Sequence, residues 1–141
     1  MSNSNVLGDC HTHLDQYPIL EIPDILSRAH KVGVAFAICA GTTIKSTRDC
    51  IKLAEQHKPL YAGVGIHPME AHEPVTEEVY AELEQMAKSS SKVVCISEVG
   101  LDFLPESPAR EIQYQVFREH IRLAKSLKLP VIFHSRESHP E

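Results

Sequence analysis

The stretch VLGDCHTHLD, residues 6–15, joins a short apolar run to two histidines spaced one residue apart. The run at 6–10 predicts a β-strand with polar residues at its carboxyl end. Because side chains alternate along a strand, His11 and His13 are expected to point to the same side. Two imidazoles on one side can share a metal ion, although two exposed histidines in a turn would give the same pattern. The stretch therefore predicts the first strand of a sheet, with a candidate metal site at its end.

The same alternation of short apolar runs and helix-period stretches continues along the chain. Further strands are expected at 34–40, 60–66, 93–97 and 131–134. Helices are expected between them, one starting near Pro23, one over 44–57, one around Leu83, and one with Ser107 as N-cap and Pro108 as its first residue. Nearly continuous apolar strands separated by helices are typical of a parallel sheet covered on both faces. The predicted fold class is therefore α/β.

Residues with ligand-type side chains also follow the other expected strands. His67 follows the third strand, Glu98 follows the fourth, and His134 and Arg136 stand at the end of the fifth. Polar groups at successive strand ends are typical of the active face of an α/β barrel. Glu98 comes directly after an apolar run, where an unpaired carboxylate would be costly to bury. A metal ion beside Glu98 would remove that cost.

The length of the chain leaves two architectures open. Five strands and four helices within 141 residues fit an open, doubly wound sheet, although such a sheet is expected to end with a further helix. An eight-stranded barrel needs roughly 200 residues or more. The pattern therefore indicates either an unusual open sheet or part of a barrel.

Composition excludes several classes of protein. With 14 Lys and Arg against 19 Asp and Glu, the formal charge of −5 argues against holding nucleic acid by bulk electrostatics. No apolar run approaches the roughly 18 residues of a membrane span, and residues 1–5 lack the features of a signal peptide. The four cysteines form no C-x-x-C pair, so we expect free thiols in a reducing, cytoplasmic setting.

Four motifs together resemble the TatD family of metal-dependent deoxyribonucleases, within the amidohydrolase-like barrels. They are D-x-H-x-H-L-D at 9–15, G-I-H-P at 65–68, E-V-G-L-D-F at 98–103 and L-x-L-P-V-x-x-H-x-R at 127–136. The resemblance implies a TIM-type (β/α)8 barrel, incomplete here with about five strands and four helices. Residues 1–141 are then expected to be the N-terminal part of a single barrel domain that is truncated after its fifth strand.

The resemblance also implies a site with two divalent metal ions (Zn²⁺, Mn²⁺ or Mg²⁺) that cleaves phosphodiester bonds of DNA. His11 and His13 match the ligands of one ion, Glu98 the carboxylate that bridges both, and His134 a ligand of the second. His67 and Arg136 match positions close to the substrate phosphate, where Arg suits a bidentate contact. The general base is expected in the part of the family pattern that lies beyond residue 141. Residues 1–141 alone are therefore expected to be inactive.

Two alternatives to a DNA nuclease stay open at this point. One is a related barrel hydrolase that acts on an amide, a lactone or a phosphotriester, and the other is a fragment without catalysis. Three further histidines are expected on the outer helical layer without a role in the site: His30, His57 and His120. His120 stands where the family commonly has Gln.

Overall fold

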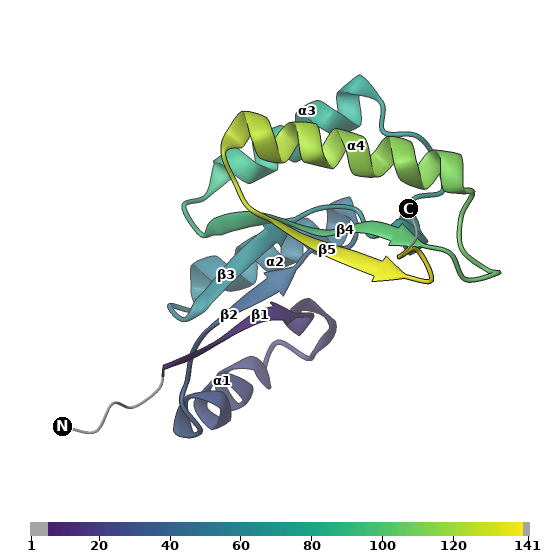
Figure 1. Cartoon of the computed structure of the whole chain (residues 1–141). Helices are drawn as coiled ribbons and strands as arrows, with labels where there is room; N and C mark the ends of the chain where they lie inside the picture. The colour runs from purple at the N-terminus through teal and green to yellow at the C-terminus, as the bar shows by residue number, and fades with distance from the viewer. Residues whose placement is uncertain (1–5, 140–141) are drawn as a thin grey trace.

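Five parallel strands and four α-helices alternate in the computed structural model, which describes residues 6–139 (Figure 1). The strands are β1 (Leu7–Thr12), β2 (Val34–Ala40), β3 (Leu60–Val64), β4 (Val93–Asp102) and β5 (Val131–Arg136). The helices are α1 (Ile22–Lys31), α2 (Ile44–Gln56), α3 (Glu77–Ser89) and α4 (Arg110–Leu127), with short 3-10 turns η1 (Leu14–Gln16) and η2 (Pro68–Glu70). The predicted α/β class is confirmed.

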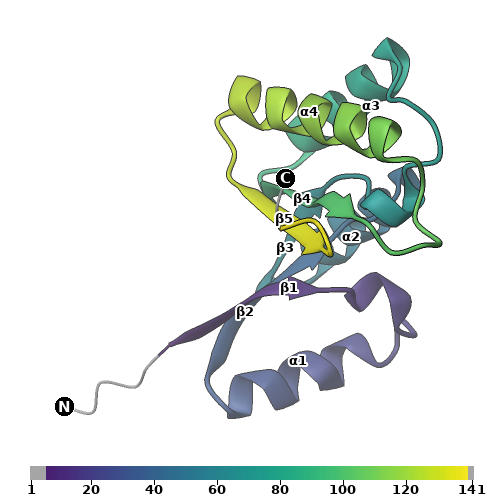
Figure 2. The ribbon, with the colours of Figure 1, turned by 45° about the vertical axis from the view of Figure 1, so that its right-hand side comes forward.

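The sheet has the strand order β1-β2-β3-β4-β5, so each strand pairs with the next one along the chain. Its arrowheads all point the same way, with α1 beside the β1 end and α3 and α4 together beside the β4 and β5 end (Figures 1 and 2). This sequential order, with a helix in each crossover, makes a half-barrel rather than a doubly wound sheet. The carboxyl ends of all five strands consequently meet along one rim.

The core lies between the strands and the helices that cover them. Ile22 of α1, Leu60 of β3 and Ile96 of β4 have no exposed surface. Two of the helices begin where a side chain satisfies free backbone N–H groups, as Thr43 does for α2 and Thr76 for α3. Because the strands are buried by the helices along most of their length, their polar carboxyl ends become accessible only at the rim.

Several element boundaries differ from the sequence prediction. β4 continues to Asp102 and β5 to Arg136, so Glu98 lies within β4 rather than after it, and His134 lies two residues before the end of β5 rather than at its end. The expected start of the last helix was also wrong, because α4 begins at Arg110 with Ala109 as N-cap. The Ser107 hydroxyl instead donates a hydrogen bond to Asp102 Oδ1 at 2.8 Å. Ser107 therefore fastens the end of β4 and does not cap the helix.

Within residues 6–139, no helix is both long enough and apolar enough to span a bilayer. The expectation that residues 1–5 are not a signal peptide falls outside the described residues.

Both edge strands expose apolar side chains. Leu7 on β1 is 53% exposed and Phe133 on β5 is 67% exposed, and neither strand has a second neighbour within the described residues. An apolar strand edge with free backbone groups is a template for pairing with another chain.

We predict that residues 1–141, produced alone, self-associate through these edges. Light scattering coupled to size-exclusion chromatography should show oligomers or aggregates, and Phe133→Lys should shift the chain toward monomer because a lysine blocks edge pairing. Leu20→Lys is the matched control, since Leu20 is an exposed apolar residue in the segment before α1 and belongs to neither edge strand. A monomeric unmodified chain would contradict the prediction.

Candidate metal centre

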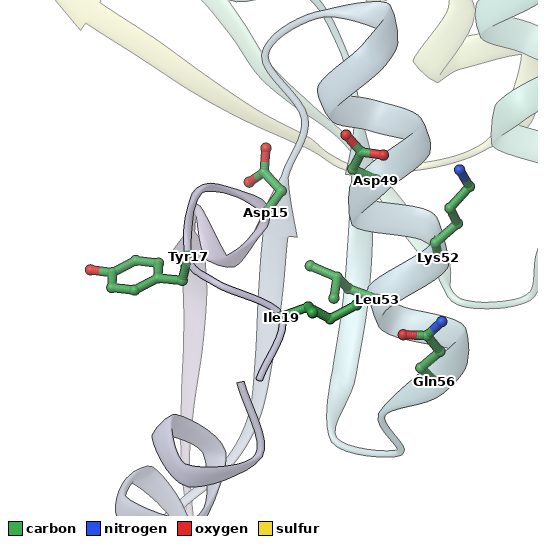
Figure 3. Close-up of a pocket in the computed structure, with 7 residues that line it drawn as sticks. All are labelled: Asp15, Tyr17, Ile19, Asp49, Lys52, Leu53 and Gln56. Carbon is green, nitrogen blue, oxygen red and sulfur yellow. The ribbon is translucent and has the colours of Figure 1, made fainter. Parts of the chain in front are cut away.

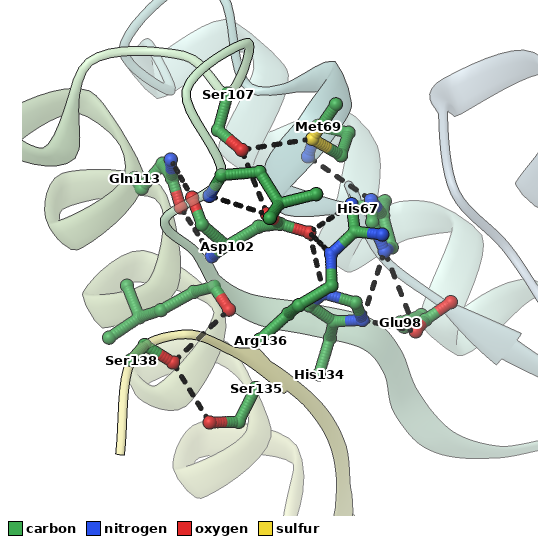
Figure 4. A network of polar contacts seen from close by, with 12 residues as sticks. His67, Met69, Glu98, Asp102, Ser107, Gln113, His134, Ser135, Arg136 and Ser138 are labelled. Carbon is green, nitrogen blue, oxygen red and sulfur yellow. Dashed lines mark hydrogen bonds and ion pairs between the residues drawn. The ribbon is translucent and has the colours of Figure 1, made fainter. Parts of the chain in front are cut away.

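The centre is built around the Glu98 carboxylate, whose two oxygens face different pairs of histidines. Oε2 lies 3.1 Å from His11 Nε2 and 3.5 Å from His13 Nε2. Oε1 lies 3.1 Å from His134 Nδ1 and 3.5 Å from His67 Nε2 (Figure 4). The ligand-type atoms lie within 4.8 Å of one another in each of these two groups. The structure thus brings together all five of these residues, which the sequence placed near strand ends.

The strands hold these side chains through the backbone. The Glu98 N–H donates to the carbonyl of Gly41 at 2.7 Å, which ties β4 to the segment after β2. Gly100, two residues further along β4, pairs with His134 of β5. A Cβ on Gly100 would lie 2.0 Å from the His134 carbonyl oxygen, and its φ of 148° also favours glycine. A glycine at this position therefore lets β5 approach closely enough to place His134 beside Glu98.

Glu98 is ionised despite its burial. Its side chain is 10% exposed, and burial alone raises its pKa. Hydrogen bonds from His67 and His134 and the charges of His67 and His11 outweigh that effect and lower the pKa to about 2. A buried carboxylate with imidazoles on both oxygens is a donor set that suits a divalent transition-metal ion.

Backbone contacts give His13 and His67 different chemistry. His13 Nδ1 lies 3.2 Å from the carbonyl oxygen of Ala40, which can only accept, so Nδ1 carries the proton and the Nε2 lone pair faces Glu98. His67 has the opposite arrangement, because the N–H of Met69 donates to its Nδ1 at 3.1 Å. Neutral His67 therefore carries its proton on Nε2. His13 presents a lone pair to the centre, whereas His67 presents a hydrogen-bond donor.

Asp102 lies beside the centre, although the sequence analysis assigned it no role. Its side chain has no exposed surface and contacts both His134 and Arg136 of β5 (Figure 4). Burial raises its pKa, but hydrogen bonds from Arg136, Ser107 and the Leu104 N–H hold the pKa well below its ordinary value. Only its place in the E-V-G-L-D-F motif, four residues after Glu98, could have drawn attention to Asp102.

Arg136 was predicted to contact the substrate, and the structure shows in addition that it pairs with the buried Asp102. Its Nε and Nη2 each lie 2.7 Å from Asp102 Oδ2, while the side chain is 46% exposed. The guanidinium is therefore anchored at one side and reaches the surface at the other. Its contact with a substrate phosphate stays a prediction.

The sequence analysis expected His120 on the outer helical layer, but the structure buries it. It is 1% exposed, its Nδ1–H donates to the Val116 carbonyl at 2.7 Å, and its Nε2 accepts from the Ile66 N–H at 3.2 Å. Burial lowers its pKa, and the hydrogen bond to Val116 only partly offsets that effect. His120 therefore fixes the backbone directly before His67. Helix periodicity alone did not show that His120 is buried, because the partner of its imidazole is a backbone N–H in a loop.

A third group of ligand-type atoms, those of Asp15, Cys39 and Cys50, lies next to a surface pocket. The pocket is formed by the segment after β1 and one side of α2 (Figure 3), and its lining residues are Asp15, Tyr17, Ile19, Asp49, Lys52, Leu53 and Gln56. Behind Asp15 lie the buried thiols of Cys39 and Cys50, with their sulfurs 3.1 Å apart. The hydrogen bond to Cys39 and burial raise the pKa of Cys50, so its thiol stays protonated. This group thus packs the core, as free thiols do.

Cys95 is also buried, whereas Cys10 is exposed. All four cysteines are free thiols in the structure, and the reducing, cytoplasmic location stays a prediction.

The chain is similar in sequence to a family described as TatD related DNase, whose sequence model matches residues 8–141. It is 37% identical over 135 residues to the uncharacterized metal-dependent hydrolase YjjV of Escherichia coli K12, covering 93% of this chain and 51% of the relative. It is 32% identical over 128 residues to the deoxyribonuclease Tat-D of Schizosaccharomyces pombe (84% and 41%). It is 31% identical over 118 residues to the 3'-5' ssDNA/RNA exonuclease TatD of E. coli K12 (82% and 44%).

Solved structures show the same fold. The crystal structure of E. coli YjjV, a TatD homologue, superposes with a TM-score of 0.85 at 34% identity, covering 95% of this chain and 52% of that one. A TatD family hydrolase from Entamoeba histolytica gives 0.83 at 25% identity, covering 96% and 51%. The expected TIM-type barrel fold, here with five strands and four helices, is thereby confirmed. The chain spans about half the length of the curated relatives it matches, and its description as the N-terminal part of one barrel domain stays a prediction.

The buried His120 gives a prediction for stability. The folded state disfavours its protonation, so its contribution is complete above the ordinary pKa of 6.5 and is lost as the pH falls below that value. His120→Gln should keep an acceptor for the Ile66 N–H and weaken this pH dependence. His120→Leu leaves that N–H unpaired and should cost about 1–3 kcal/mol. Urea unfolding of the full-length protein at pH values above and below 6.5 measures both effects, and equal pH dependence in wild type and His120→Gln would contradict the assignment.

Proposed function

Because this chain belongs to the TatD-related DNase family, we propose that the full-length protein hydrolyses phosphodiester bonds of DNA with two divalent metal ions held at Glu98. The observation that carries this proposal is that the two oxygens of the Glu98 carboxylate face different pairs of histidines. Oε2 faces His11 and His13, and Oε1 faces His134 and His67. One carboxylate with ligands on both sides is the arrangement that a bridging residue requires.

The ligand assignment follows from the lone pairs and distances of the centre. We propose that His11 and His13 bind one ion together with Glu98 Oε2, and that His134 binds the second together with Glu98 Oε1. An imidazole-rich set favours Zn²⁺ or Mn²⁺ over Mg²⁺, which prefers oxygen ligands. When bound, a pair of such ions activates water and neutralises charge on the attacking and leaving oxygens of a phosphodiester.

His67 and Arg136 are proposed to contact the substrate phosphate. The backbone N–H at Met69 leaves the proton of neutral His67 on Nε2, and a proton-bearing nitrogen can donate to a phosphate oxygen but cannot bind a cation. Arg136 uses Nε and Nη2 to contact Asp102, and its half-exposed guanidinium has five N–H donors in all. In this proposal His67 supplies a hydrogen-bond donor and Arg136 a partly exposed cation beside the metal centre, where both can contact a phosphate oxygen.

The general base for the attacking water is proposed to come from the other half of the barrel. The relatives are about twice the length of the part that this chain matches. In a protein of that length, residues after 141 would add ligands and the base to the centre. Residues 6–139 then supply the bridging carboxylate, the histidines and the substrate contacts.

Glu98→Gln tests the proposed function in the full-length protein. The amide keeps the shape but loses the charge, so metal content should fall and metal-dependent cleavage of DNA should drop roughly a hundredfold or more. Metal analysis and a labelled-oligonucleotide assay measure both, with amide, lactone and phosphotriester substrates run in parallel. Glu55→Gln, at an exposed position of α2, is the control. Normal cleavage and metal content in Glu98→Gln would refute the bridge, and a wild-type preference for one of the other substrates would refute the DNA assignment.

His67→Ala separates substrate binding from metal binding. If Nε2–H contacts the phosphate, the variant should keep both ions while KM for DNA rises by about tenfold, the effect of losing one charge-assisted hydrogen bond. Steady-state kinetics with metal analysis of the same sample gives the answer. Loss of an ion from the His67→Ala protein would show that His67 is a ligand instead.

A further inference from the structure

Five hydrogen-bond donors surround the carboxylate of Asp102, and Figure 4 shows its contacts with His134, Arg136 and Ser107. Its Oδ2 accepts from His134 Nε2 at 2.9 Å and from Nε and Nη2 of Arg136 at 2.7 Å each. Its Oδ1 accepts from the Ser107 hydroxyl at 2.8 Å and the Leu104 N–H at 3.2 Å. A carboxylate oxygen that already faces a guanidinium acts toward His134 as an acceptor.

The backbone of Asp102 is fixed as firmly as its side chain. The Asp102 N–H donates to Gln113 Oε1 at 2.8 Å, and Gln113 Nε2 donates back to the Asp102 carbonyl at 2.7 Å. Gln113 is itself 1% exposed, so this pair of bonds is shielded from water. Asp102 therefore holds one position before any ligand arrives.

In the metal-free centre both ring nitrogens of His134 face an acceptor, Nε2 the Asp102 carboxylate and Nδ1 the Glu98 carboxylate. When a cation lies beside Glu98, Nδ1 must present its lone pair, and Asp102 then holds the remaining ring proton on Nε2. Nδ1 lies 3.1 Å from Glu98 Oε1 and 3.3 Å from His67 Nε2. The opposite tautomer would direct an N–H at the position proposed for the second ion.

We propose that Asp102 is a positioning residue that holds His134 in the tautomer and ring orientation needed to bind the second metal ion. This inference rests on the proposed function of the site. Metal-bound histidines commonly donate their other ring N–H to a carboxylate, and loss of that partner weakens metal binding by about 10- to 100-fold. A purely structural role, in which Asp102 only ties β4 to β5 through Arg136, would change stability but not the tautomer.

The test reads the tautomer directly in metal-free, full-length protein labelled with ¹⁵N-histidine. Two-bond ¹H–¹⁵N correlation spectra, with the His134 signals assigned from His134→Gln, should show the proton on Nε2 in wild type. Asp102→Ala should lose this preference, and Asp102→Asn, which keeps an oxygen acceptor, should retain part of it. Asp49→Ala removes an aspartate paired with Lys45 on α2 and should change nothing.

Metal titration with a competing chelator gives the second measurement on the same proteins. The affinity for the second ion should fall about 10- to 100-fold in Asp102→Ala and less in Asp102→Asn, while the affinity for the first ion stays unchanged. An unchanged His134 spectrum with both affinities within twofold of wild type, in either folded variant, would overturn the proposal. If wild type binds no metal, the proposed function fails, but the spectra of the metal-free proteins still decide whether Asp102 sets the tautomer.

Discussion

The negative charge of Glu98, held almost out of water within β4, is the constraint on which the rest of the site depends. A buried carboxylate is costly unless it is paired, and here each oxygen has its own pair of imidazole nitrogens. These imidazoles come from β1, from the segments that follow β1 and β3, and from β5. The sequential order of the parallel strands brings those segments to one rim. The fold and the site are therefore consequences of the same topology.

Much of this arrangement could be predicted from the sequence because strand ends are visible in it. Apolar runs followed by His11, His67, Glu98 and His134 indicated both the strands and the rim on which these residues meet. The prediction ended three of the strands too early, at residues 10, 97 and 134, whereas β1, β4 and β5 continue through the site. Backbone hydrogen bonds, not polarity, decide where a strand ends, and neighbouring strands supply those bonds here.

The residues that sequence reasoning missed owe their roles to partners distant in the chain. Asp102 contacts residues more than 30 positions away, and the buried partner of His120 is the Ile66 N–H, 54 positions away. Neither periodicity nor local spacing reports such pairs. Helix periodicity placed His120 correctly on α4 but could not show that its imidazole points inward to a polar group. Polar residues with distant buried partners are therefore where sequence patterns carry the least information.

The same side chain is given different chemical tasks by the atoms behind it. A carbonyl lies behind His13 and a carboxylate behind His134, and each can accept the ring proton on the side away from the centre. A backbone N–H behind His67 leaves the proton of the neutral ring on the nitrogen that faces the centre. In the proposed centre, His13 and His134 are therefore metal ligands, whereas His67 is a donor to the substrate. On that proposal, one rim of an acidic chain presents both a cation site and a phosphate contact.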